Sequence, residues 1–168
     1  MDIIIRKIEA SDNPFIENII KSVFIELHLP LTGTAYADGA TGNMYRAYQN
    51  KGDSYFVASE NGTILGGGGI KAINTTTGIV CELQKMYLSP GARNKGIGKL
   101  LLQKCLDFAK TAGYEHCYLE TLPQLKTAIL LYEKNGFKHL QKPLGNTGHS
   151  TCNVWMAKDL TDDYKRLT

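Results

Sequence analysis

The chain has 168 residues, a net charge of +3 at neutral pH and 43% hydrophobic residues. This length predicts a single domain over residues 1–168, and the hydrophobic content excludes a disordered chain. No apolar run reaches the roughly 18 residues that a membrane span needs, and no long Lys/Arg run is present, which excludes membrane and nucleic-acid partners. The N-terminus lacks the basic segment and cleavage site of a signal peptide, so we expect a cytoplasmic protein.

The cysteines give no support to a metal site or a disulfide framework. Cys81, Cys105, Cys117 and Cys152 form no C-x-x-C pair, and none has a histidine close by in the sequence. Buried reduced thiols are the expected state, and no metal ion is expected.

The first elements are a strand, a helix and a loop. A β-branched run predicts a strand at residues 3–8, and apolar residues at helical spacing predict a helix that follows it. Asn13 is expected to cap this helix, with Pro14 in its first turn, and Pro30 to end it. Residues 29–40 are expected to form a loop, followed by a short helix at 43–49.

A hairpin and a third strand follow. Asn61-Gly62 predicts the tight turn between strands at residues 55–59 and 63–72. Four consecutive glycines, residues 66–69, interrupt the second of these strands and indicate a bulge or a close approach of another backbone. A further turn is expected at residues 74–78, before a strand at 79–88.

The C-terminal half alternates helices and strands. Helices are expected at residues 97–111 and 123–136, with Gly113 capping the first of them. Strands are expected at residues 117–121, 137–140 and 152–157, and residues 161–168 form a polar tail. This order predicts an α/β (α+β) fold, with a mixed, mostly antiparallel central sheet of about seven strands flanked by helices.

The segment between the strand at 79–88 and the helix at 97–111 has the geometry of an anion site. The first N–H groups of a helix lack internal partners, and the helix dipole favours negative charge. Gly96 and Gly98 allow close approach, and Arg93, Lys95 and Lys99 add positive charge. Neither the P-loop nor the dinucleotide pattern fits, because Ile97 and Leu101 stand where those motifs require other residues.

Three sequence blocks resemble the GCN5-related N-acetyltransferase (GNAT) superfamily. The blocks are Glu82-Leu83-x-x-Met86-Tyr87-Leu88-Ser89-Pro90 followed by Arg93-x-x-Gly96-x-Gly98, then Leu119-Glu120-Thr121, and then Ala128-x-x-Leu131-Tyr132-Glu133-Lys134-Asn135-Gly136-Phe137. The pattern Arg93-x-x-Gly96-x-Gly98 resembles that family's acetyl-CoA signature, and the resemblance of the three blocks covers nearly the whole chain.

The resemblance implies an N-acetyltransferase that binds acetyl-CoA between splayed fourth and fifth strands. Met86 and Leu88 would hold the pantetheine arm through their backbones, and the amides of residues 94–99 would hold the pyrophosphate. The implied cofactor-binding residues are Met86, Tyr87, Leu88, Arg93, Asn94, Lys95, Gly96, Ile97, Gly98, Lys99 and Lys134. Leu125 stands where the family often has an Asn, so a side-chain contact to the cofactor is lost or supplied elsewhere.

Transfer of an acetyl group to an amine requires a base for the ammonium and a proton donor for the leaving thiolate. Tyr132 is the expected donor, since a Tyr pKa of about 10 is not far from that of a thiol. Glu82 is the expected base, with Glu120 or water as alternatives. Strand alternation places Glu82, Gln84, Met86 and Leu88 on one face unless a bulge intervenes.

Two loops, residues 29–40 and 142–150, are the expected borders of the acceptor site. His149, His28, Tyr36 and Arg46 are candidate contacts, and Arg46 could meet a carboxylate. Short loops with Gly and Pro favour a small amine or amino acid as acceptor. The alternatives are acetylation of a protein N-terminus or lysine, a CoA-binding sensor without turnover, and a nucleotide-binding module. The sequence also leaves a homodimer open.

Overall fold

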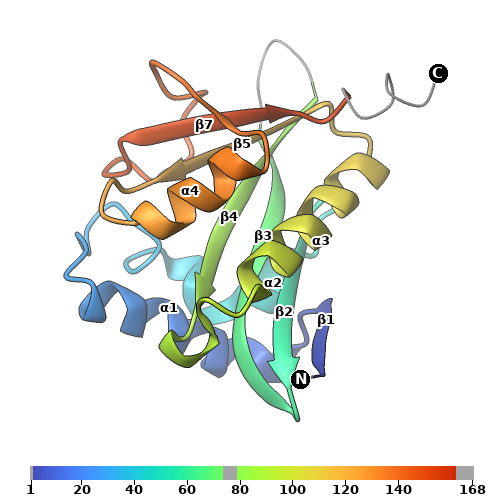
Figure 1. Ribbon diagram of the computed structural model, residues 1–168, viewed down its shortest axis with the longest axis vertical. Coiled ribbons are helices and arrows are strands. Elements are labelled where there is room, and N and C mark those ends of the chain that lie inside the picture. Colours follow the sequence, from blue (N-terminus) through green and yellow to red (C-terminus); the bar gives the residue numbers. More distant parts are fainter. Residues whose placement is uncertain (1, 74–78, 162–168) are drawn as a thin grey trace.

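A mixed sheet forms the centre of the protein in the computed structural model, which describes residues 2–73 and 79–161 (Figure 1). The strand order within these residues is β1-β2-β3-β4-β5-β7-β6, and all neighbours are antiparallel except β4 and β5. The strands are β1 (Ile3–Lys7), β2 (Ser54–Glu60), β3 (Thr63–Ile73), β4 (Val80–Leu88), β5 (His116–Thr121), β6 (Lys138–His139) and β7 (Val154–Asp159). The predicted mixed, mostly antiparallel sheet is confirmed.

Two layers of helices cover the sheet, α3 and α4 on one face and α1 and α2 on the other (Figure 1). The helices are α1 (Asn13–Glu26), α2 (Met44–Ala47), α3 (Ile97–Thr111) and α4 (Lys126–Lys134). The predicted bounds of α3 are confirmed, and Gly113 with φ +90° follows its last turn. Three cysteines are buried and Cys152 is half-buried, all four as free thiols. No helix in the described ranges is long and apolar enough to cross a membrane.

The start of α1 and its surroundings differ in detail from the sequence prediction. Asp12, not Asn13, is the cap position of α1, and the Asn13 side chain instead accepts a hydrogen bond from the Tyr45 N–H of α2. The helix ends at Glu26 rather than at Pro30, because the chain turns at His28 with φ +51°. The helix expected at residues 43–49 is split into a 3-10 helix, Gly39–Asn43, and α2. The turn expected at 74–78 and nearly all of the expected tail lie outside the described residues.

The glycine run in β3 allows another part of the protein to approach the strand closely, as predicted, and the neighbouring strand β4 has a bulge opposite it. A Cβ on Gly67 would lie 2.5 Å from a ring carbon of Tyr55, and one on Gly69 would lie 2.6 Å from another. Glycine at these positions therefore lets the Tyr55 ring lie over β3. The Tyr55 hydroxyl then donates a 2.8 Å hydrogen bond to the carbonyl of Lys85 in β4. The register between β3 and β4 shifts between Gly67 and Gly69, opposite that point.

The bulge at Lys85 overturns the simple alternation expected for β4. Lys85 has φ +49°, and the residues after it change faces relative to those before it. Met86 and Leu88 contact the core beneath α3, while Tyr87 packs with the residues beneath α1. Glu82 therefore does not share a face with Met86 and Leu88. The bulge separates the strand into a part that carries polar groups and a part that follows the cofactor cleft defined below.

Candidate active site

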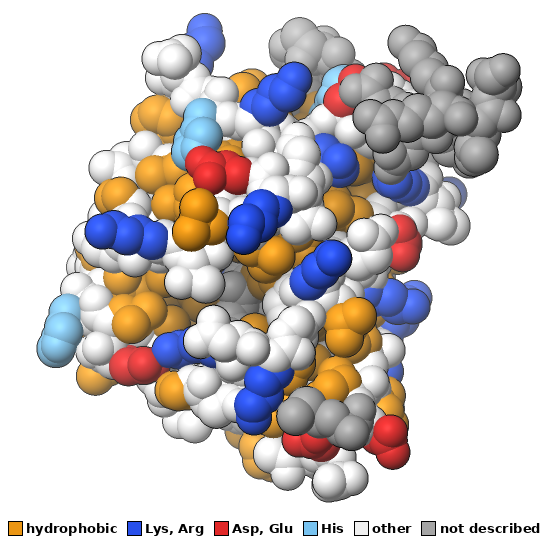
Figure 2. Space-filling view, in the orientation of Figure 1, with side chains coloured by type: hydrophobic (Ala, Val, Ile, Leu, Met, Phe, Trp, Pro, Cys, Tyr) orange, Lys and Arg blue, Asp and Glu red, His pale blue; other side chains and the backbone are white. Residues whose placement is uncertain are grey.

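A cleft of about 440 Å³ opens where β4 and β5 separate. The two strands pair only from Val80 to Glu82 on β4, so the edge of β4 beyond Glu82 has no strand partner on that side. Backbone groups on such an edge are available to a ligand. The cleft, called the cofactor cleft below, is lined by residues of β4, β5, α4 and the loop before α3. Figure 2 shows hydrophobic side chains within a hollow near α4, with Lys and Arg side chains along its borders.

The loop before α3 presents backbone N–H groups to one end of the cofactor cleft. Asn94 has φ +60° and Gly96 has φ +78°, so the chain turns twice before the helix begins. Within the described chain, the N–H groups of residues 94–99 donate no backbone hydrogen bond. A Cβ at Gly96 would meet no atom within 4 Å, which leaves open space in front of the helix. This arrangement suits a phosphate or pyrophosphate group.

Arg93 lines the cofactor cleft and also forms contacts that its place in the motif did not suggest. Its guanidinium makes two 2.8 Å hydrogen bonds to the carboxylate of Glu26 at the end of α1, and its Nε donates to the Leu88 carbonyl. These bonds tie α1 to the end of β4 and to the anion-binding loop. Arg93 therefore fixes the shape of the cofactor cleft and has much of its hydrogen-bonding capacity already used.

Tyr132 of α4 lies on the wall of the cofactor cleft with 6% of its surface exposed. Its ring packs against Phe137, and its hydroxyl forms no hydrogen bond with a described residue. Burial raises the pKa of Tyr132 above its ordinary value of 10.0. The hydroxyl therefore keeps its proton at neutral pH and can donate a hydrogen bond to a group that enters the cleft.

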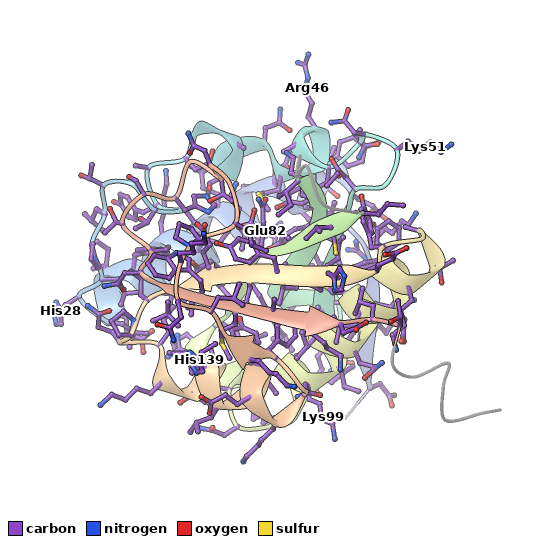
Figure 3. The ribbon with its side chains drawn as sticks, turned by 90° about the horizontal axis from the view of Figure 1, so that it is seen from above. His28, Arg46, Lys51, Glu82, Lys99 and His139 are labelled. Atoms are coloured by element: carbon purple, nitrogen blue, oxygen red, sulfur yellow. The ribbon has the colours of Figure 1, made fainter. Side chains whose placement is uncertain are left out.

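Glu82 is buried in the centre of the protein, with 1% of its surface exposed (Figure 3). Its Oε2 accepts a 2.6 Å hydrogen bond from the Gln84 amide, whose oxygen in turn accepts one from the Tyr48 hydroxyl. Desolvation by burial raises the pKa of Glu82 to about 7, against an ordinary value of 4.5, although Gln84 stabilises the charged form. A carboxylate with this pKa can exchange a proton near neutral pH.

Glu120 and His149 complete a polar cluster with Glu82. One ligand atom from each of these three residues lies within 4.8 Å of the others. The two oxygens of Glu120 accept hydrogen bonds from the hydroxyls of Tyr118 and Thr147, at 2.7 and 2.6 Å. The spacing could accommodate a metal ion, but hydroxyl donors already occupy both oxygens of Glu120. Glu120 also lines the cofactor cleft, so it connects the cluster to that cleft.

The two loops expected at the acceptor site meet each other. The Thr151 hydroxyl donates to the carbonyl of Thr32 at 2.7 Å, and the Thr151 N–H donates to the carbonyl of Gly33. Nearby, His149 Nε2 lies 3.4 Å from Asp38 Oδ2. These contacts join residues 29–40 to residues 142–151 above the polar cluster. His149 belongs both to this join and to the polar cluster, so the two lie next to each other.

A buried ion pair lies beside this join. Lys85 Nζ is 2.8 Å from Asp38 Oδ2, and the Lys85 side chain is 3% exposed. Desolvation lowers the pKa of Lys85, while hydrogen bonds from His149 and Lys85 hold the pKa of Asp38 well below its ordinary value. The same Asp38 oxygen thus contacts both a residue of the β4 bulge and a residue of the opposite loop.

Three residues expected near the acceptor do not reach the polar cluster. Arg46 and His28 are exposed and point away from the protein, far from Glu82 (Figure 3). Tyr36 packs against Phe24, with the Lys21 ammonium over its ring. Arg46 lies on a short helix whose inner face is occupied by Met44, so it cannot supply the expected carboxylate contact.

The other expected cofactor residues are placed in different ways. Met86, Tyr87, Leu88, Arg93, Asn94, Gly96, Gly98 and Lys99 line the cofactor cleft. Ile97 is buried in the core, and Lys95 and Lys134 are exposed residues outside the lining. Leu125 lines the cleft with an apolar side chain, as its departure from the family pattern implied.

The residues that sequence reasoning missed are further polar partners around the cluster: Asp38, Tyr48, Gln84, Lys85 and Tyr118. Their positions along the chain show no common pattern, because they come together from four separate segments. One signal was available. Glu82, Gln84 and Lys85 place three polar side chains within a strand whose neighbours predicted burial, and buried charged groups need partners.

Comparison with known proteins agrees with this geometry. A model of the acetyltransferase (GNAT) family matches residues 21–137. The chain is 39% identical over 158 residues to YjgM of Escherichia coli (strain K12), an uncharacterized N-acetyltransferase, in an alignment that covers 94% of this chain and 95% of the relative.

Solved structures of similar fold point the same way. An acetyltransferase of the GNAT family from Staphylococcus aureus Mu50 superposes with a TM-score of 0.81 at 24% identity, covering 95% of this chain and 99% of the other. The structure of yncA from Salmonella typhimurium, determined with acetyl-CoA, gives a TM-score of 0.74 at 22% identity, and the match covers 95% of each chain.

Proposed function

The chain belongs to the GNAT family of acetyltransferases, and on that premise we propose that it transfers an acetyl group from acetyl-CoA to the primary amine of a small molecule. The observation that carries the proposal is the buried Glu82, with its pKa of about 7, in a polar cluster next to the cofactor cleft. A protein substrate would need an open groove, whereas the loops over the cluster are joined by His149–Asp38 and Thr151–Thr32.

The cofactor cleft fits the two ends of acetyl-CoA by its chemistry. The N–H groups of residues 94–99 and the dipole of α3 would hold the pyrophosphate, and Lys99 lies close by on the first turn of that helix. The unpaired edge of β4 around Met86 and Leu88 would hold the amides of the pantetheine arm. The apolar side chains of Leu119, Ala128 and Leu131 would exclude water from the thioester.

Glu82 is proposed as the base that removes a proton from the acceptor ammonium. An ammonium has no lone pair, so this proton must leave before nitrogen attacks the thioester carbonyl. Glu82 does not line the cofactor cleft, so we propose that a water molecule relays the proton from the ammonium to Glu82. Glu120, with both oxygens hydrogen-bonded, would hold the ammonium in place rather than accept its proton.

Tyr132 is proposed to stabilise the departing thiolate. Its hydroxyl lies on the cleft wall without a hydrogen-bond partner among the described residues, and it stays protonated because burial raises its pKa. A thiol has a pKa of about 8.5, so complete transfer of the Tyr132 proton is uphill, and a hydrogen bond to sulfur is the main contribution. A backbone N–H near Met86 would support the oxyanion that forms as nitrogen attacks.

The test is a panel of acceptors with acetyl-CoA, read by thiol release and by mass of the product. The panel contains free amino acids, small amines, and peptides with a free N-terminus or an internal lysine. We expect the highest kcat/KM for a free small amine. Peptides acetylated far more efficiently than every free amine would overturn the proposal, and so would the absence of turnover in a protein that binds acetyl-CoA.

A further inference from the structure

Lys85 is a buried cation in the wall of the cofactor cleft, and the reaction described above does not use it. Four basic residues line that cleft: Lys85, Arg93, Lys99 and Lys126. Lys99 and Lys126 are exposed, and Arg93 is engaged by Glu26. The Lys85 side chain is 3% exposed and is placed by the bulge, which Tyr55 fixes through the Lys85 carbonyl.

A buried lysine is a poor way to stabilise a fold. The cost of desolvating an ion pair often exceeds the attraction between its charges, and an apolar pair of similar volume commonly serves as well. Lys85 occupies a strained backbone position with φ +49°, so its conformation adds a further cost. A cation held in this way at the wall of a ligand cleft is better explained by recognition of an anion.

The present partner of Lys85 can be exchanged. Asp38 belongs to the loop at residues 29–40, and 30% of its side chain is exposed, so it can turn toward water while Lys85 cannot. Its Oδ2 contacts both Lys85 and His149, and its Oδ1 accepts a hydrogen bond from the Ala40 N–H. The carboxylate of a ligand could take over the two contacts of Oδ2 without any change in the sheet.

The anion position lies next to the proposed amine position. His149 contacts Asp38 on one side and belongs to the cluster of Glu82 and Glu120 on the other. One imidazole therefore separates a site for a carboxylate from a site for an ammonium. A molecule that carries both groups on a short chain matches this arrangement of charges.

We propose that Lys85 recognises the carboxylate of an amino-carboxylate acceptor, which displaces Asp38 when it binds. The inference rests on the proposed function, since it names the class of small amine. It also assigns Asp38 a role, which is to neutralise Lys85 in the absence of the acceptor.

The experiment compares amino acids with their carboxamides, which keep the amine and the size but lose the negative charge. Glycine, β-alanine, 4-aminobutyrate and the standard L-amino acids are assayed beside their amides with acetyl-CoA. For the preferred compound, the wild type should favour the acid over its amide by roughly tenfold to a hundredfold in kcat/KM, the usual effect of a hydrogen bond to a charged group. A wild type that acetylates amides as well as acids would overturn the inference but leave the small-amine function intact.

Two variants separate recognition from a structural role. Lys85→Met should lower kcat/KM for the acid by roughly tenfold to a hundredfold more than kcat/KM for the amide, which abolishes the preference for the acid. Asp38→Asn, which weakens the internal competitor, should lower KM for the acid and leave KM for the amide unchanged. If Lys85 and Asp38 merely join the two loops, both variants will reduce activity on acid and amide equally. Asp38→Asn decides the matter on its own if Lys85→Met fails to fold.

Calorimetry on the CoA-bound wild type keeps the two proposals distinguishable. Should neither acids nor amides be acetylated, the proposed small-amine function fails. In that case, saturable binding of an amino acid that is abolished by Lys85→Met would still support a carboxylate site. Amino acids that do not bind would overturn it.

Discussion

Glu82→Gln should make the protein more stable and less active at the same time. Glu82 is 1% exposed, and burial raises its pKa from an ordinary value of 4.5 to about 7. Glutamine keeps the shape of the side chain and an oxygen that can accept the hydrogen bond from Gln84. It removes the negative charge that makes burial costly above neutral pH.

The size and sign of the effect follow from the difference between the two pKa values. Below a pH of about 4.5 Glu82 is protonated in both the folded and the unfolded chain, so it adds no pH dependence there. As the pH rises from there through 7, the unfolded chain loses its proton first, and the free energy of unfolding falls. The shift corresponds to roughly 3 kcal/mol when complete, at about 1.4 kcal/mol per unit. Glutamine does not titrate, so the variant escapes this loss.

Thermal unfolding across pH 4 to 9 measures the effect. The Tm of Glu82→Gln should exceed that of the wild type above pH 7 by up to roughly 10 °C, and the two should converge near pH 4. The exposed Glu115→Gln is the matched control and should show no such dependence. Glu82→Gln should also lower kcat/KM roughly 10²- to 10⁴-fold and remove the inflection near pH 7 from the pH dependence of kcat/KM. A variant that is no more stable than the wild type at pH 8 would refute the assigned ionisation of Glu82.

The remaining predictions concern the cofactor cleft and the loop over the polar cluster. Tyr132→Phe should lower kcat on the order of 10²-fold with acetyl-CoA affinity unchanged, measured by steady-state kinetics and calorimetry; turnover like that of the wild type would make Tyr132 a packing residue. Gly96→Asp should abolish the thermal stabilisation by acetyl-CoA, because it places a carboxylate at the anion site, whereas Gly91→Asp outside the cleft should keep it. His149→Ala should raise the KM of the acceptor and leave that of acetyl-CoA unchanged; the opposite pattern would assign its loop to the cofactor.

Local sequence patterns predicted well those elements of the fold that do not depend on contacts with distant residues. The bounds of α3 follow from apolar spacing and from Gly113, and the hairpin turn at Asn61-Gly62 has positive φ at both residues. The glycine run in β3 correctly indicated a close approach. It did not reveal that the approaching group is the Tyr55 ring, because that contact depends on the pairing of β2 with β3.

The polar cluster was the part least accessible from sequence. The bulge at Lys85 changes which face each β4 side chain occupies, and strand alternation cannot register a single extra residue. Arg46 was selected for its charge alone, but α2 turns it toward solvent (Figure 3). Lys85 was overlooked because its partner, Asp38, lies 47 residues earlier in a loop whose path over the sheet no local pattern determines.

The opening of the sheet links the two halves of the proposed chemistry. The loss of pairing after Glu82 creates the cofactor cleft, and the bulge three residues later turns Met86 and Leu88 toward α3 while Glu82, Gln84 and Lys85 stay with the polar groups. A strand without the bulge would place either the apolar residues or the polar ones on the wrong face. Removing the bulge should therefore impair cofactor binding and acceptor binding together, whereas Gly96→Asp should affect cofactor binding alone and His149→Ala acceptor binding alone. The Tyr55 hydroxyl donates a hydrogen bond to the Lys85 carbonyl at the bulge. The cofactor cleft and the polar cluster therefore both depend on Tyr55.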